Sequence, residues 1–199
     1  MASLRELRKH PVIDLAITVA IAVGIAYLVQ AFIVKPYRVP SGSMEPTIAI
    51  GERIIASRFT LRFSDPSRDQ IIVFHPNGVG SDVYDTQTAS SETFVKRLIG
   101  MPGETIGAAG GEVYVCTGDG PAEGGSIEST PGCRFLDEPF VSSPQDDFGP
   151  TRIPDDRYFM MGDNRADSDD SRNWGSITKG QMIGTAFMSY WPPNRVSIW

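Results

Sequence analysis

One short strand-like stretch carries a lysine at its centre: Thr93-Phe94-Val95-Lys96-Arg97-Leu98-Ile99. Alternate side chains of a β-strand point to the same face, so Lys96 shares a face with Phe94 and Leu98. An apolar environment disfavours the ammonium form and lowers the pKa of a lysine, which makes the free amine available as a base near neutral pH. A lysine at the edge of a sheet, with its charged head in water, is an equally open interpretation.

Similar short apolar runs lie on both sides of this stretch and are separated by turn residues. The chain has 20 glycines and 15 prolines, a composition typical of a mainly β domain with many turns rather than of a helical bundle. Little regular structure is expected between residues 117 and 154, and a polar exposed loop is expected between 76 and 91. The further predicted strands cover residues 53–56, 70–74, 112–115, 157–161 and 184–190.

Length and charge limit the possible functions. After an apolar front segment, the remainder of the 199 residues is the size of one domain. The net charge of -6 argues against a nucleic-acid partner, because phosphate binding requires a concentrated basic face. The acidic loop 163–172 lacks the spacing of a calcium loop, since Arg165 and Arg172 fall on key positions. No metal and no organic cofactor are therefore expected.

The amino-terminal part is almost continuously apolar from residue 12 to residue 34, with Asp14 as its only charged member. About 22 helical residues at roughly 1.5 Å each match a hydrocarbon core of about 30 Å. We therefore expect a cytoplasmic segment 1–11, a transmembrane anchor 12–34 and an extracytoplasmic β-rich domain 35–199. The motif Val29-Gln30-Ala31 would also suit a signal-peptide cleavage site, but the apolar run is long and continues beyond it.

Two cysteines, Cys116 and Cys133, enclose a stretch rich in glycine, proline and serine. A disulfide between them would stabilise such a flexible loop and would persist only in an oxidising, extracytoplasmic compartment. Sequence alone cannot establish the pairing, so two free thiols remain the alternative.

Ser43 is a candidate nucleophile. It lies in the turn-rich stretch Pro40-Ser41-Gly42-Ser43-Met44-Glu45-Pro46, although a serine in such a place is more often an ordinary turn residue. A serine nucleophile needs a histidine or a neutral lysine to activate it. The chain has only two histidines, His10 and His75, so a Ser/His/Asp triad is poorly supplied.

The ordered combination of an apolar anchor, the Ser41–Ser43 turn, Lys96-Arg97 and the loop 162–172 resembles type I signal peptidases. The resemblance covers nearly the whole chain. It implies a domain of antiparallel sheets in which Ser43 is the nucleophile and Lys96 its general base. It further implies that Ser41 contributes to the oxyanion hole and that Ser168 orients the Lys96 amine.

The same resemblance implies that Asp170 and Arg172 form a salt bridge that supports the loop. At Ala166 and Asp167 the loop departs from the commoner family pattern, so the resemblance assigns these two residues no role. The implied substrate is the signal peptide of an exported preprotein, and the implied location is the cell membrane, with one span in the lipid bilayer. Expected pocket residues for small substrate side chains are Val39, Pro40, Met44, Ile48, Phe94 and Val95, each of which could instead be core.

Two other functions compete with this interpretation. A self-cleaving repressor-type Ser/Lys protease would need a DNA-binding domain in place of the apolar segment. A catalytically silent, membrane-tethered β domain would have Ser43 and Lys96 as ordinary surface residues, and covalent trapping of Ser43 would distinguish it from an enzyme.

Overall fold

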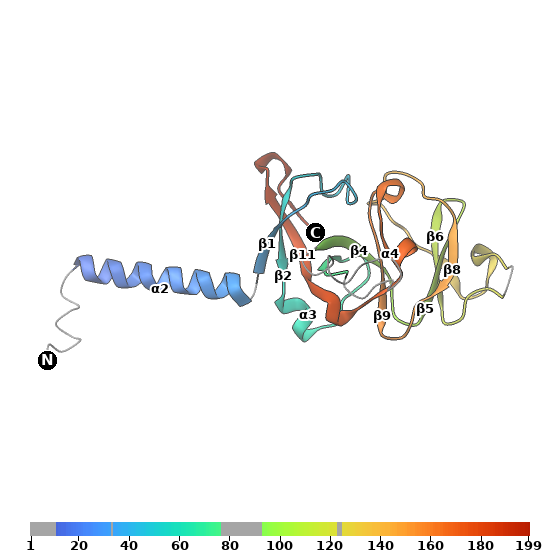
Figure 1. The fold of residues 1–199 in the computed structure, drawn as a ribbon, viewed down its shortest axis with the longest axis horizontal. Coiled ribbons are helices and arrows are strands. Elements are labelled where there is room, and N and C mark those ends of the chain that lie inside the picture. Colours follow the sequence, from blue (N-terminus) through green and yellow to red (C-terminus); the bar gives the residue numbers. More distant parts are fainter. Residues whose placement is uncertain (1–10, 33, 77–92, 123–124) are drawn as a thin grey trace, which may run out of the picture.

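The structure is a computed structural model that describes residues 11–32, 34–76, 93–122 and 125–199. Helix α2, Pro11–Phe32, projects from a β-rich body (Figure 1). Strand β1 already begins at Val34, so the predicted apolar segment 12–34 ends in a strand rather than in the helix. Among the described residues, no helix combines the length and apolar character needed to cross a membrane.

The larger sheet contains eight antiparallel strands in the order β1-β2-β11-β3-β4-β9-β10, with β12 paired to β11. The predicted strands at 53–56, 70–74, 93–99, 157–161 and 184–190 all belong to it. Its members are β1 Val34–Arg38, β2 Arg53–Ser57, β3 Ile71–Phe74, β4 Phe94–Gly100, β9 Arg157–Met161, β10 Ile177–Thr178, β11 Met182–Trp191 and β12 Ser197–Ile198.

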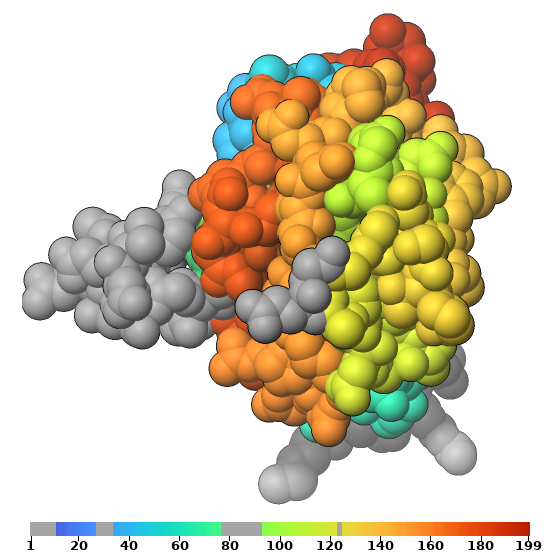
Figure 2. All heavy atoms as spheres, turned by 90° about the vertical axis from the view of Figure 1, so that its right-hand side faces the viewer, coloured from blue at the N-terminus to red at the C-terminus, as the bar shows by residue number. Residues whose placement is uncertain are grey.

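The smaller sheet is antiparallel and has the order β7-β6-β5-β8. Gly110 and Gly111 have φ angles of 64° and 84° and close the β5–β6 hairpin, because a tight hairpin turn of this kind needs two residues with positive φ. The strands are β5 Glu104–Ala109, β6 Glu112–Thr117, β7 Cys133–Phe135 and β8 Phe148–Arg152. Figure 2 faces the end of the molecule opposite α2, and segments coloured green to orange cover most of it.

The region between residues 117 and 154 is more regular than predicted. It supplies β7 and β8, which pair with β6 and β5 respectively. Short helices complete the described fold. They are α3 Phe59–Phe63, α4 Ser171–Trp174, η1 Ile127–Ser129, η2 Arg165–Asp167, η3 Lys179–Gln181 and η4 Pro193–Arg195. The predicted exposed loop 76–91 lies, apart from its first residue, outside the described residues.

Strand β4 is central to the packing. It lies between β3 and β9, and every residue after Phe94 in it is buried. Its side chains reach three separate apolar clusters, through Leu98, Val95 and Ile99 respectively. The third cluster joins the two sheets, because Ile99 packs there with Ile106 and Val113 of the smaller sheet. A polar residue on β4 is therefore enclosed on both sides.

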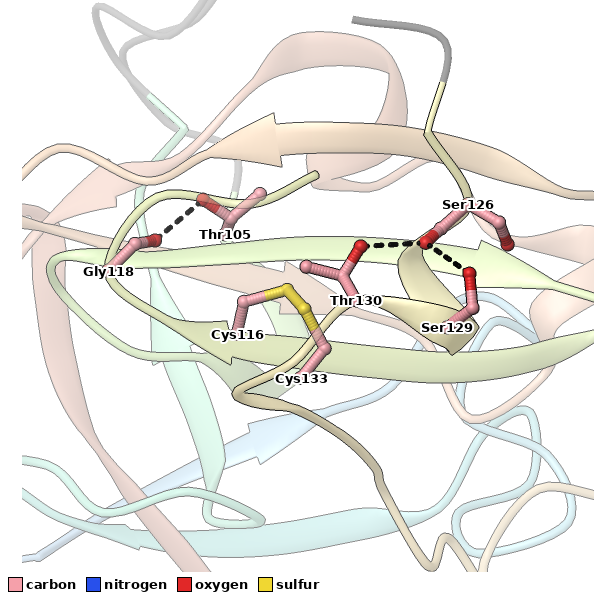
Figure 3. Close-up of a disulfide and its surroundings, with 7 residues drawn as sticks. All are labelled: Thr105, Cys116, Gly118, Ser126, Ser129, Thr130 and Cys133. Atoms are coloured by element: carbon pink, nitrogen blue, oxygen red, sulfur yellow. Dashed lines mark hydrogen bonds between the residues drawn. A yellow bond between two sulfur atoms is a disulfide. The ribbon is translucent and has the colours of Figure 1, made fainter. Parts of the chain in front are cut away.

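Cys116 and Cys133 form a disulfide, as the sequence analysis anticipated, and it joins β6 to β7 (Figure 3). Neighbouring hydrogen bonds order the same region: Thr105 Oγ1 donates to the carbonyl of Gly118 at 2.9 Å, and Thr130 Oγ1 donates to that of Ser126 at 2.8 Å. Neither cysteine lines the groove described below, so the crosslink has a structural role at the edge of the smaller sheet.

Replacing both Cys116 and Cys133 by alanine should lower thermal stability while leaving the surroundings of Ser43 and Lys96 nearly unchanged. The chain-entropy estimate for a loop of this length is about 3 kcal/mol. Thermal unfolding followed by circular dichroism would measure the loss, with non-reduced wild-type protein as reference. Two alkylatable thiols in native, non-reduced protein, or an unchanged melting temperature in the variant, would contradict the expectation.

Candidate active site

Ser43 lies in the connection between β1 and β2 and is only 7% exposed. Its neighbour Met44 is fully buried, as is Ile48, whose N–H donates to the Met44 carbonyl at 2.8 Å. These two apolar side chains anchor the turn in the core and thereby restrict Ser43. The hydroxyl oxygens of Ser41 and Ser43 are 3.3 Å apart, within hydrogen-bonding distance.

The loop 162–172 holds this turn from the other side. The N–H of Asn164 donates to the Ser43 carbonyl at 3.1 Å, and Asn164 Nδ2 donates to the Gly42 carbonyl at 3.2 Å. Gly162 allows this close approach, because a Cβ there would lie 2.4 Å from the Ser43 carbonyl oxygen and 2.3 Å from Ser168 Oγ. Sequence analysis gave Asn164 no role, since nothing local indicates that its partners lie about 120 residues earlier.

Lys96 lies opposite Ile72 in the middle of β4 and is 5% exposed. Its neighbours along the strand, Phe94 and Leu98, pack against the same apolar cluster. Desolvation by burial lowers the pKa of Lys96 from 10.5 to about 8, although the carboxylates of Asp170 and Asp169 act in the opposite direction. Of the two readings that the sequence left open, the structure therefore favours the buried lysine.

A groove of about 350 Å³ brings the principal candidates together. Ser41, Ser43 and Lys96 all line it, as do four of the six predicted pocket residues: Val39, Pro40, Phe94 and Val95. The other two, Met44 and Ile48, are fully buried and pack in the core, so the pocket prediction is wrong for them. Asp167 and Asp169 also line the groove and give it an acidic edge that sequence analysis did not assign.

Ser168 lies beside Gly162, close to the Ser43 segment. Its hydroxyl is buried and has no hydrogen-bond partner among the described residues. The expected hydrogen bond from Ser168 to the Lys96 amine is therefore not formed in this structure.

Asp170 and Arg172 form an ion pair at 2.8 Å that braces the loop. Asp170 is fully buried, accepts a hydrogen bond from the N–H of Gly162 at 3.0 Å, and also caps α4 by accepting one from the N–H of Arg172. The Arg172 guanidinium donates to the Arg165 carbonyl at 2.9 Å. The carboxylate and guanidinium thus tie both ends of the loop together.

Two further buried ion pairs support the loop, and sequence analysis missed both. Arg97 pairs with Asp163 through contacts of 2.8 and 2.6 Å, and its guanidinium also lies 3.9 Å from the centre of the Phe140 ring. Arg165 pairs with Glu138 through contacts of 2.7 and 2.6 Å. Such two-point contacts fix orientation as well as distance. They hold the loop against both the lysine strand and the connection that leads to β8.

Titratable side chains elsewhere do not gather into a metal site: within the described ranges, no group of three or more His, Cys, Asp or Glu residues could hold an ion. The chemistry that the groove offers comes from the hydroxyls of Ser41 and Ser43, the amine of Lys96 and the carboxylates at its edge.

Comparison with known proteins identifies the family. The model of the family described as "Signal peptidase, peptidase S26" matches residues 12–191 of this chain. The chain belongs to the signal peptidase family, peptidase S26. "Probable signal peptidase I-2" of Synechocystis sp. is 33% identical over 94% of this chain and 76% of its own length. "Signal peptidase I" of Bacillus amyloliquefaciens is 34% identical over 95% and 93%, respectively.

A solved signal peptidase I from Enterococcus faecalis matches 61% of this chain and 97% of its own, with 26% identity and a TM-score of 0.42. "Signal peptidase I S" of Bacillus subtilis is 31% identical over 98% of both chains. As a member of this family, the protein is a serine peptidase of the signal peptidase I type. The mainly β architecture of antiparallel sheets agrees with the fold that the sequence resemblance implied.

Activity of this signal peptidase should rise with pH along an acid limb centred near 8, because the pKa of Lys96 is lowered to about 8 and only the neutral amine can accept a proton. If Lys96 is the base, kcat/KM should fall by about tenfold per pH unit below the limb. Lys96→Arg should lose at least about a thousandfold in kcat, since a guanidinium stays protonated. The measurement is kcat/KM against pH for both proteins, because kcat/KM reports the pKa of the free enzyme.

Lys179→Arg is the matched control, because Lys179 is 41% exposed and pairs with Asp65 on the surface. It should retain the wild-type profile. An acid limb near the ordinary lysine value, or substantial turnover by Lys96→Arg, would exclude Lys96 as the base.

Proposed function

We propose that this protein removes signal peptides from exported preproteins, with Ser43 as nucleophile and Lys96 as general base. The observation that supports this most directly is the groove that Ser43 and Lys96 share, in which Lys96 is buried and its pKa is lowered to about 8. At pH 8 about half of such amines are neutral, whereas an exposed lysine would be neutral in well under about one molecule in a hundred. Burial thus gives Lys96 a neutral amine near pH 8, so that it can act as the base that a histidine provides in a Ser/His/Asp triad.

The reaction follows from these groups. The neutral Lys96 amine takes the proton of Ser43 Oγ as that oxygen attacks the scissile carbonyl carbon. The resulting oxyanion accepts hydrogen bonds from the Ser43 N–H and the Ser41 hydroxyl. The ammonium of Lys96 then gives its proton to the leaving amine, which releases the mature protein and leaves the signal peptide as an ester on Ser43. Water, deprotonated by Lys96, hydrolyses that ester.

The groove also suits a peptide with small side chains before the cut. Its apolar lining comes from two segments, Val39 and Pro40 before the Ser43 turn and Phe94 and Val95 on β4. An extended peptide placed between these two segments would direct alternate side chains into the lining, which leaves little room for large groups. Asn164 donates hydrogen bonds to the carbonyls of Gly42 and Ser43, and these bonds hold the proposed nucleophile in position beside the apolar lining.

We further propose that the whole apolar segment 12–34, of which the described part of α2 alone does not meet the requirements of a span, anchors the enzyme in the cell membrane as a single span, with the β domain on the extracytoplasmic side. The helix has 22 residues, and apolar side chains on different sides of it, such as Val12, Leu15 and Ile21, are more than half exposed. Exposed apolar groups on all sides are unfavourable in water and suited to hydrocarbon. Arg5, Arg8 and Lys9 before it favour a cytoplasmic amino terminus, and the disulfide suits an oxidising compartment beyond it.

Full-length protein in detergent should cut a preprotein after a small residue, and Ser43→Ala should abolish the cut, because it removes the oxygen that forms the acyl-enzyme. Mass spectrometry of the products locates the bond. Ser142→Ala, which removes an exposed hydroxyl outside the groove, is the control and should cleave normally. Cleavage by well-folded Ser43→Ala, or none by wild-type protein, would overturn the proposal.

A further inference from the structure

A second cavity, of about 460 Å³, lies apart from the groove and shares no lining residue with it. Helix α3 forms one wall, and the start of β11 with Lys179 before it forms the other. We define the α3 patch as the lining residues Arg58, Phe59, Arg62 and Lys179 together with Phe63, whose ring lies beside that of Phe59.

The α3 patch combines aromatic and cationic groups on the surface. Phe59 and Phe63 are 53% and 69% exposed, and their ring centres are 4.4 Å apart. Arg58 and Arg62 are exposed, and in the described part of the chain neither forms an ion pair. Phenylalanines side by side in water are unfavourable, and guanidinium groups beside them add affinity for an anion.

The register of the first two strands places this patch at the end of α2. Val34 lies directly opposite Ser57, the last residue of β2, and Arg58 and Phe59 follow at once. Residues opposite each other in an antiparallel pair are about 5 Å apart. Helix α2 ends at Phe32, so the α3 patch begins close to the point where α2 meets the domain (Figure 1).

We propose that the α3 patch binds the headgroup of an anionic phospholipid, which deepens the proposed function and rests on the membrane anchoring of α2. A helix end that leaves a bilayer lies at the level of the phosphates, so Arg58 and Arg62 meet the headgroup while Phe59 and Phe63 enter the boundary with the acyl chains. An arginine guanidinium can donate two parallel hydrogen bonds to two oxygens of one phosphate.

The charge balance of the patch favours an anion. Lys179 donates to Asp65 at 2.8 Å, so one of the three cations already has a partner, and Arg58 and Arg62 remain for a phosphate. The Asp65 side chain is 82% exposed to water.

Hydrogen exchange on the full chain in lipid nanodiscs tests this site. Discs of phosphatidylcholine alone are compared with discs that contain about one-third phosphatidylglycerol. Exchange of backbone amides in the segment 58–63 should slow by about threefold or more in the anionic discs. The slowing should disappear in the double variant Arg58→Gln and Arg62→Gln.

The matched control is the double variant Arg53→Gln and Arg134→Gln, which removes the same charge from exposed positions at the far end of β2 and on β7. It should behave as wild type. Equal exchange in both discs, retained slowing in the first variant, or equal slowing by free inorganic phosphate or a soluble acidic peptide would overturn the lipid site. A chain that does not enter discs at all would instead refute the anchoring, whereas incorporation without slowing refutes only the lipid site.

Discussion

The burial of Lys96 in the centre of β4 is the constraint on which the rest of the site depends. An ammonium group enclosed by apolar strands is costly, and the protein lowers that cost by lowering the pKa of the amine to about 8. The nearby carboxylates of Asp170 and Asp169 favour the charged form, so burial and charge oppose one another. Their balance leaves a lysine that can change its protonation state near neutral pH, as a base in acyl transfer must.

The proposed mechanism requires Ser43 to keep a fixed position in the groove that it shares with Lys96, and the loop 162–172 holds the Ser43 segment. Asn164 donates hydrogen bonds to the carbonyl oxygens of Gly42 and Ser43, and Gly162 leaves space for this close approach. Three ion pairs hold the loop: Asp170 with Arg172, Arg97 with Asp163 and Arg165 with Glu138. Buried ion pairs contribute little net stability, but removal of one partner typically costs about 3–5 kcal/mol. The effect of the three ion pairs here is to fix the conformation of the loop 162–172.

The sequence predicts the local features of this molecule well and the long-range ones poorly. Short apolar runs bounded by turn residues identified most strands of the larger sheet, because a buried strand can be recognised from the apolar residues within it. In the smaller sheet only β6 was predicted, and β5, β7 and β8 were missed. Strands β7 and β8 have few apolar residues, and each depends on a neighbouring strand and, in β7, on the disulfide. Met44 and Ile48 were assigned to the pocket because proximity in sequence does not reveal which way a side chain points.

The candidate site shows the same division. Ser43 and Lys96 were found by resemblance of ordered motifs, and the pattern around Lys96 gave an independent physical reason for its burial. Sequence analysis did not predict the supporting contacts of Asn164, Arg97 and Arg165. Their partners lie 27 to about 120 residues away in the sequence, and no local pattern indicates contacts over such separations. A family motif identifies Ser168 but does not determine its hydrogen bonds, and the bond expected to Lys96 is not formed in this structure.

The most direct test of the central claim, that Lys96 activates Ser43, is covalent trapping with an acylating peptide inhibitor. Peptide mapping by mass spectrometry would locate the adduct in wild-type protein and in Lys96→Met, which keeps the apolar stem but lacks the amine. The account predicts an adduct on Ser43 in wild-type protein and almost none in Lys96→Met, although Ser43 is present in both. An adduct on another residue, or equal labelling of Ser43 in the variant, would contradict it.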